Sequence, residues 1–193
     1  MQPVNPKQFD QAVYDLFDKF VHGDIDRRAF IDGASRYAVG GMTGAMILDV
    51  LTPRFAEAQQ VAKDDKRVVT EYVEYPSPNG NAKMRGYLVR PADKKGKLPG
   101  VLVVHENRGL NPHIEDIARR VALEGFMAFA PDALFPLGGC PGDEDKAREL
   151  FPKLDQTKTR EDFVAAAAFL KGRADCTGKV AVVGFCYGGG ISN

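Results

Sequence analysis

"KVAVVGFCYGGG", residues 179–190, is the most informative segment of this sequence. An apolar run typical of a strand buried on both faces leads into a glycine-rich turn that carries one thiol, Cys186. Gly184 and Gly188 stand two residues before and two residues after this cysteine, which is the Gly-x-nucleophile-x-Gly spacing of a sharp strand-to-helix turn. Small residues are needed there because the central residue adopts a strained backbone conformation and its neighbours approach closely. The pattern predicts that Cys186 is a nucleophile.

The same turn predicts the surroundings of the thiol. A helix that begins at the turn places Cys186 at its N-terminus, where the helix dipole favours the thiolate. The backbone N–H of Tyr187 would then point toward a developing oxyanion. A dinucleotide-binding fingerprint is disfavoured because Cys186 occupies the place of its second glycine. Two alternatives stay open for this cysteine: an inert thiol buried beside a tight turn, and a redox-sensing thiol.

Upstream of this stretch, short apolar strands alternate with helices. Residues 67–90 predict a β-hairpin around Asn79-Gly80. Residues 100–106 and 126–132 are typical of strands buried on both faces. Right-handed crossovers then give a parallel sheet covered on both sides, with the antiparallel hairpin at its edge, which is an α/β fold. Helices are expected from Asn111 to Gly125, over 143–151 and over 159–171.

The first 62 residues differ from the rest and predict a helical N-terminal arm, which leaves residues 63–193 as the α/β domain. Asn5, with Gln8 three residues on, has the spacing of a capping box, and the apolar residues that follow fall on one helix face. Gly23 is placed to end this helix.

A pair of arginines in the arm bears on localisation. Arg27-Arg28-x-Phe30-Ile31, followed by a glycine-rich and moderately apolar stretch and then Ala56-Glu57-Ala58, resembles a twin-arginine export signal. Three charged residues interrupt the apolar region, and a long leader precedes the arginines. A cytoplasmic protein that retains the segment as a structural arm is therefore the favoured interpretation, and a periplasmic protein with such a signal is the alternative.

Composition excludes several classes of function. The chain has 193 residues, 44% of them apolar, and its 26 Lys and Arg balance its 26 Asp and Glu. A net charge of zero offers no field that attracts nucleic acid or an anionic membrane. Three widely spaced cysteines argue against a disulfide framework and against a thiolate zinc site. The sequence contains no apolar run long enough to span a membrane as a helix.

Glu106 is the second candidate site residue. It follows the strand over 100–105, so it is expected at the same carboxyl edge of the sheet as Cys186, where α/β proteins bind their ligands. A solvated surface glutamate is the alternative. The segment "HENRG" at 105–109 lacks the second histidine of a His-Glu-x-x-His zinc helix, and it follows a strand.

Residues 66–193 resemble the dienelactone hydrolase family of α/β-hydrolases. Two strands are followed by "LVVHENRGLN", then by "APDALF", and then by "GFCYGGG" after the fifth strand. The resemblance implies a partial α/β-hydrolase fold, with Cys186 as nucleophile and Glu106 as the glutamate that pairs with the resting thiol and controls its ionisation. It also implies a second oxyanion donor at the backbone N–H of Asn107. The implied substrate is a small ester or lactone, with no cofactor or metal.

Two features depart from the family pattern. Family members carry an arginine in the loop after the Pro-Asp segment, where it holds a substrate carboxylate, whereas this loop, "ALFPLGGCPG", has none. Arg108 is the candidate to replace it. In this fold an aspartate and then a histidine follow the nucleophile, but neither is among the seven residues after Cys186. His22, His105 and His113 all precede it.

We therefore interpret the sequence as the front part of a hydrolase, cut just after its nucleophile and weak or inactive by itself. The apolar strand that leads to Cys186 would then lie at the sheet edge with unpaired backbone groups. The alternative is a non-catalytic product that binds a partner through the helical arm and this edge. Nothing in the sequence sets the oligomeric state.

Overall fold

The computed structural model describes residues 9–38, 40–52 and 59–193. The chain divides into two compact units, Met1–Arg54 and Phe55–Asn193. The first unit is helical and the second contains the sheet, as the sequence predicts.

The described residues of the first unit form three α-helices whose ends follow from capping residues. They are α1 (Gln11–His22), α2 (Arg27–Ala34) with the short 3₁₀ helix η2 (Ser35–Tyr37), and α3 (Gly44–Leu51). Asp10 caps α1 through its side chain, and Gly23 ends it in the left-handed conformation that glycine adopts readily. The end at Gly23 is therefore confirmed, whereas the expected cap Asn5 lies outside the described residues.

An aromatic cluster forms the core of this first unit. The rings of Phe20 and Phe30 lie 5.6 Å apart between centroids, and the ring of Phe17 lies 6.0 Å from that of Phe30. Arg27 and Arg28 form the first turn of α2, so the pair of arginines stands at the start of a helix whose Phe30 is fully buried. Because the packed rings come from both α1 and α2, tertiary contacts between these two helices stabilise them.

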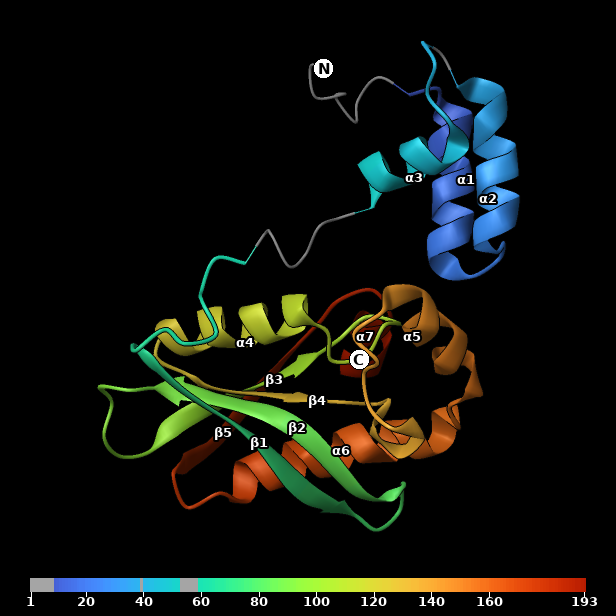
Figure 1. Ribbon diagram of the computed structural model, residues 1–193. Helices are drawn as coiled ribbons and strands as arrows, with labels where there is room; N and C mark the ends of the chain where they lie inside the picture. The colour runs from blue at the N-terminus through green and yellow to red at the C-terminus, as the bar shows by residue number, and fades with distance from the viewer. Residues whose placement is uncertain (1–8, 39, 53–58) are drawn as a thin grey trace. The chain divides into compact units, whose positions relative to one another are not determined.

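The second unit is built on one mixed five-stranded sheet in the order β1-β2-β4-β3-β5 (Figure 1). β1 pairs antiparallel with β2, and β2 antiparallel with β4, while β3 lies parallel to both β4 and β5. The predicted hairpin around Asn79-Gly80 and the predicted parallel strands are confirmed. The strands are β1 (Val68–Ser77), β2 (Ala82–Pro91), β3 (Leu98–Val104), β4 (Met127–Pro131) and β5 (Cys176–Gly184).

Helices cover the two faces of this sheet. Figure 1 shows α4 over one face and α6 over the other, and separate apolar clusters fill the two interfaces. α6 begins three residues before the sequence predicts because Asp155 caps it, accepting hydrogen bonds from two backbone N–H groups. The helices are α4 (Pro112–Leu123), η3 (Phe135–Leu137), α5 (Glu144–Leu150), η4 (Phe151–Lys153), α6 (Gln156–Gly172) and α7 (Tyr187–Ser192).

β5 lies at the edge of the sheet in the part of the chain that the structure describes. Val182 in this strand is 44% exposed, whereas every residue of β4 is buried. An apolar strand at an edge of the sheet is the arrangement that the sequence predicts for this segment.

Residues just before the sheet pack with the second unit rather than with the helical one. The backbone N–H groups of Gln60 and Val61 donate to Asp116 Oδ1 at 3.1 and 2.8 Å. The fully buried Arg119 donates through Nε to the carbonyl oxygen of Val61 at 2.9 Å. Since these contacts attach the segment to α4, the division between the compact units falls after Arg54, eight residues earlier than the change in sequence pattern suggests.

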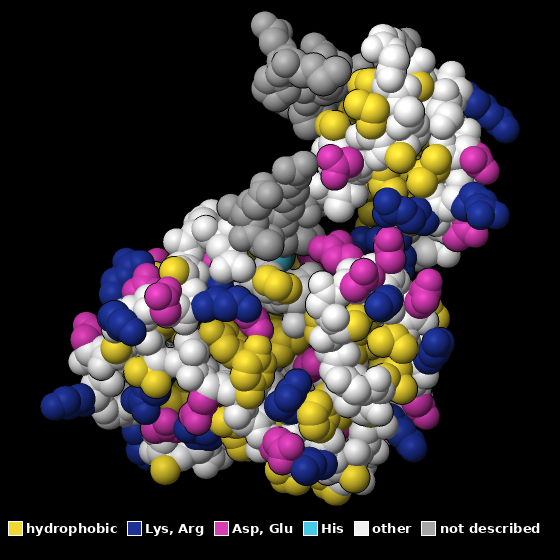
Figure 2. Space-filling model, viewed as in Figure 1, with side chains coloured by type: hydrophobic (Ala, Val, Ile, Leu, Met, Phe, Trp, Pro, Cys, Tyr) yellow, Lys and Arg dark blue, Asp and Glu magenta, His cyan; other side chains and the backbone are white. Residues whose placement is uncertain are grey.

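Surface charge and helix composition are relevant to two functions that the sequence disfavours, nucleic-acid binding and membrane spanning. On the face of the second unit shown in Figure 2, acidic and basic side chains are interspersed and form no patch of one sign. None of the described helices has both the length and the apolar character needed to cross a bilayer.

Candidate active site

The ends of β3 and β5 bring the two main candidates to one edge of the sheet. Val104 is the register partner of Gly184, so Glu106 and Cys186 each stand two residues beyond a paired position. The N–H of Phe185 donates to the carbonyl oxygen of Val104 at 3.2 Å and continues the pairing past the strand end. The topology therefore places both predicted residues at neighbouring strand ends, as expected for a ligand site in a parallel sheet.

Cys186 occupies a strained turn that only small neighbours permit. Its φ of 52° and ψ of −111° lie in a region that non-glycine residues rarely adopt. A Cβ atom on Gly184 would lie 1.9 Å from the carbonyl oxygen of Gly188, and one on Gly188 would lie 2.4 Å from that of Val104. The thiol is exposed, in contrast to the buried Cys176. This exposure does not fit the alternative of a buried, inert thiol.

Tyr187 follows the cysteine as the first residue of α7. Its hydroxyl donates to Gln156 Oε1 at 2.9 Å, and its ring meets that of Phe151 edge to face with centroids 4.7 Å apart. Burial raises the pKa of the Tyr187 phenol, while Arg160 opposes the rise. The side chain of Tyr187 is therefore held by α6 and η4.

His105 is a structural residue at the end of β3. It is fully buried, and its Nε2 accepts a hydrogen bond from the N–H of Ala133 at 3.1 Å. Nδ1 must then carry the proton, and it lies 2.5 Å from the carbonyl oxygen of Glu106 as a donor. Burial lowers the pKa of the imidazole, so the ring is neutral. With both nitrogens engaged, His105 fixes the start of the next loop and cannot serve as a general base.

The loop over 106–109 carries the remaining candidates. Glu106 Oε2 is buried and finds no hydrogen-bond partner among the residues that the structure describes. Arg108 is 9% exposed; its Nη1 donates to Asn107 Oδ1 at 3.1 Å, and its Nε lies 3.3 Å from Glu144 Oε2 without hydrogen-bond alignment. This arrangement favours a structural role for Arg108 over the expected contact with a substrate anion.

A second loop, over 132–140, supports the first one. The buried Asp132 accepts hydrogen bonds from the N–H groups of Leu134 and Cys140, both at 3.0 Å. The thiol of Cys140 donates to the carbonyl oxygen of Arg108 across 3.6 Å, and burial raises its pKa. The Cys140 thiol therefore stays protonated and acts as a packing donor.

Glu144 is the residue of this region that sequence reasoning missed. It is the first residue of α5, half-buried, and it lies against Arg108 from a position 36 residues further along the chain. The sequence shows that a helix begins near residue 143, but no spacing rule links that helix to the loop over 106–109.

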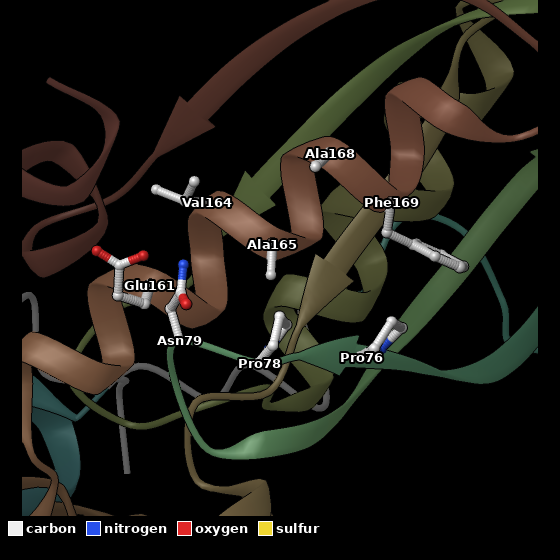
Figure 3. Close-up of a pocket in the computed structure, with 8 residues that line it drawn as sticks. All are labelled: Pro76, Pro78, Asn79, Glu161, Val164, Ala165, Ala168 and Phe169. Atoms are coloured by element: carbon white, nitrogen blue, oxygen red, sulfur yellow. The ribbon is translucent and has the colours of Figure 1, made fainter.

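We find no second candidate active site among the described residues. They contain no group of three or more His, Cys, Asp or Glu arranged to hold a metal ion. A cavity of about 330 Å³ lies between the β1–β2 hairpin and α6, lined mainly by apolar side chains such as Pro78, Val164 and Phe169 (Figure 3). It shares no residue with the site at Cys186.

The sequence of this chain is similar to two protein families and to several curated proteins. A family model for the dienelactone hydrolase family matches residues 84–193, and one described as YqhI-like matches residues 1–39. "Putative hydrolase fragment YghX" of Escherichia coli K12 is 56% identical over 116 residues, covering 60% of this chain and 99% of that protein. "Putative carboxymethylenebutenolidase" of the same strain is 33% identical, covering 68% of this chain and 49% of that protein.

A solved structure, m3DLH, agrees with these sequence comparisons. It is 29% identical, with a TM-score of 0.55, and the match covers 65% of this chain and 52% of that one. The chain therefore spans about half the length of this structure and of the carboxymethylenebutenolidase.

Proposed function

The chain belongs to the dienelactone hydrolase family, and we propose that it carries the nucleophilic part of a hydrolase for small carboxylic esters or lactones. The observation that supports this most strongly is the turn at Cys186. The turn combines an exposed thiol, a strained backbone and two glycines that tolerate no side chain. A fold maintains such a conformation when the surrounding structure requires it, and these conformations cluster at active sites.

In the proposed reaction Cys186 forms a bond to the carbonyl carbon of the ester. As sulfur attacks, the thiol proton passes to the carboxylate of Glu106, and the carbonyl π electrons move onto oxygen. The backbone N–H groups of Tyr187 and Asn107 stabilise this oxyanion. When the tetrahedral intermediate collapses, the C–O bond to the alcohol breaks, and the departing alkoxide takes the proton back from Glu106. The products of this half-reaction are the free alcohol and an acyl thioester on Cys186.

Hydrolysis of the thioester then requires a base that activates water. His105 is not that base, because both of its ring nitrogens are engaged in hydrogen bonds inside the protein. We therefore expect the present 193 residues to undergo acylation without sustained turnover.

The proposed substrates have uncharged acyl groups. The loop over 132–140 contains no arginine, and the guanidinium of Arg108 is already engaged with Glu144 and Asn107. The site therefore offers no free cation from that loop or from Arg108 to hold a substrate carboxylate. Uncharged small esters and lactones fit this arrangement better than the anionic dienelactones after which the family is named.

The test is a burst experiment with p-nitrophenyl acetate. The intact chain should release nitrophenolate in a rapid phase of one equivalent or less, followed by a slow phase or none. Cys186→Ala should abolish the rapid phase, whereas Cys140→Ser, which changes a thiol held inside the supporting loops, should retain it. A rapid phase of unchanged size in Cys186→Ala would rule out Cys186 as the nucleophile.

A further inference from the structure

A buried carboxylate oxygen normally has a hydrogen-bond partner, and one oxygen in the loop over 106–109 has none among the described residues. Glu106 Oε2 is buried without a hydrogen-bond partner among the described residues, although Arg108 is only two residues away. An unpaired buried carboxylate oxygen is costly, so its isolation needs a physical cause.

The contacts of Arg108 supply that cause. Its side chain is 10% exposed and lies against Glu144 of α5, with Nε 3.3 Å from Oε2. Nη1 is used by Asn107, and the carbonyl oxygen of Arg108 accepts from the thiol of Cys140. Both the guanidinium and the backbone of Arg108 are therefore held on the side of α5 and of the loop over 132–140.

The position of Glu144 is itself fixed by α5. Asp143 caps the helix by accepting a hydrogen bond from the N–H of Lys146 at 2.8 Å, which sets the first turn that carries Glu144. Burial raises the pKa of the Glu144 carboxyl, Arg108 and then Arg148 oppose the rise, and Glu106 adds to it. The charges of Glu144 and Glu106 therefore interact with each other in the same cluster that holds Arg108.

We propose that Glu144 is a positioning residue that holds the guanidinium of Arg108 away from Glu106. This inference rests on the proposed function, because it explains how Glu106 is left free to face Cys186. Without Glu144, the guanidinium of Arg108 loses its carboxylate partner, and Glu106 is the other carboxylate two residues before it in the same loop. An Arg108–Glu106 pair would neutralise the group that receives the thiol proton.

The reactivity of the Cys186 thiol provides a measurable readout of whether Arg108 is held away from Glu106. In the proposed site, an unpaired carboxylate facing Cys186 disfavours a second negative charge on the sulfur. If Arg108 pairs with Glu106, that negative charge is neutralised, and we expect the sulfur to react faster with an alkylating reagent. The alkylation rate of Cys186 follows its thiolate fraction.

Other titratable groups surround this edge, and all of them except Asp145, which one control variant replaces, are the same in every variant compared. Asp132 and Cys140 belong to the neighbouring loop, and His113 of α4 lies against the ring of Phe185, with centroids 6.4 Å apart. Tyr187 belongs to α7, and its hydroxyl donates to Gln156 on α6. On α5, Asp145 lies 3.5 Å from Arg148.

Two single substitutions break the same ion pair with opposite expected results. In Glu144→Gln the cation remains and is free to pair with Glu106, so alkylation of Cys186 in the full chain by iodoacetamide at neutral pH should be about tenfold faster. In Arg108→Met no cation remains, so alkylation should stay at or below the wild-type rate. A purely structural ion pair predicts that both variants change in the same direction, and that result would overturn the proposal.

A rescue and a charge control complete the experiment. The double variant Glu144→Gln with Arg108→Met should return alkylation to about the wild-type rate, since it removes the freed cation. Asp145→Asn removes an equal charge from the same helix turn and should leave the rate within about twofold of the wild type. Acceleration that persists in the double variant, or that appears equally in Asp145→Asn, would contradict the role assigned to Glu144.

Glu106→Gln separates this proposal from the proposed function. If Glu106 faces the thiol, alkylation of Cys186 should be faster in this variant as well. No change in Glu106→Gln would contradict the proposed role of Glu106 itself. Acceleration in Glu106→Gln but none in Glu144→Gln would overturn only the positioning role.

Discussion

At the scale of single residues, the turn at Cys186 follows from steric limits that glycine alone satisfies. The cysteine adopts a positive φ, and Gly188 lies so close to β3 that a side chain there would meet the backbone oxygen of Val104. The Gly-x-Cys-x-Gly spacing was enough to predict this turn because the requirement is local. The burial of Arg108 could not be predicted in the same way, because its partner Glu144 is set by tertiary packing.

Gly188→Ala should therefore disrupt the turn, whereas Gly190→Ala should not. The added methyl group at Gly188 would lie 2.4 Å from the carbonyl oxygen of Val104, while at Gly190 nothing lies within 4 Å. We expect Gly188→Ala to lower the free energy of unfolding by about 1–3 kcal/mol or more and to abolish the burst with p-nitrophenyl acetate. Thermal unfolding and burst amplitude measure the two effects. Equal behaviour of the two alanine variants would contradict the close approach of Gly188 to β3.

The proton-transfer role of Glu106 predicts a dependence on the leaving group. Glu106→Gln removes the acceptor of the thiol proton for every ester, but acylation by p-nitrophenyl acetate should fall least, because nitrophenolate departs without a proton. Acylation by a matched alkyl ester should fall by about 10²-fold or more, because an alkoxide leaves poorly unless it is protonated. Rates of thioester formation followed by mass spectrometry provide the comparison. An equal change for both esters would show that Glu106 does not return a proton to the leaving group.

At the scale of elements, hydrogen bonds tie the strand ends and loops of the site together. His105 at the end of β3 joins the segment after β4 through the N–H of Ala133, and Asp132 holds the loop that ends at Cys140. The sequence predicted the strands and helices themselves, because apolar periodicity and residues such as Asn111 and Gly125 mark them locally. It did not predict these cross-connections, which depend on residues far apart in the chain.

Burial of His105 gives the second unit a defined sensitivity to acid. The folded protein holds this imidazole neutral with a lowered pKa, whereas the unfolded chain takes up a proton below about pH 6.5. Acid therefore favours the unfolded state, and stability should be full above about pH 6.5 and fall as the pH drops below it.

His105→Gln tests this dependence. The variant should be less stable at neutral pH, because it replaces a buried and hydrogen-bonded ring, but its stability should fall less between about pH 6.5 and 5 than that of the wild type. His22→Gln, at the exposed end of α1, should leave the acid dependence of the second unit unchanged. Urea unfolding at a series of pH values measures both, and an identical slope in His105→Gln would contradict the assignment.

At the scale of the whole molecule, the chain consists of two compact units with separate cores. The change from helical to strand patterns was visible in the sequence. The exact division was not, because the attachment of Gln60 and Val61 to α4 depends on the buried Asp116 and Arg119.

Separate cores predict separate responses to substitution. Phe30→Ala should destabilise the helical unit by about 3–5 kcal/mol, because it removes a fully buried ring from that core. The acylation rate of Cys186 in the second unit should stay within about twofold of the wild type. Hydrogen exchange resolved by peptide reports on each unit, and a loss of protection in β3 and β5 equal to that in α2 would contradict this independence.

The central claim is that the sulfur of Cys186 is an exposed nucleophile at the sheet edge. Peptide mass spectrometry of the intact chain after brief reaction with p-nitrophenyl acetate tests it most directly. We expect one acetyl group, found on the peptide that contains Cys186 and removed by hydroxylamine. Acetyl groups only on Cys140 or on lysines, with Cys186 unmodified, would contradict it.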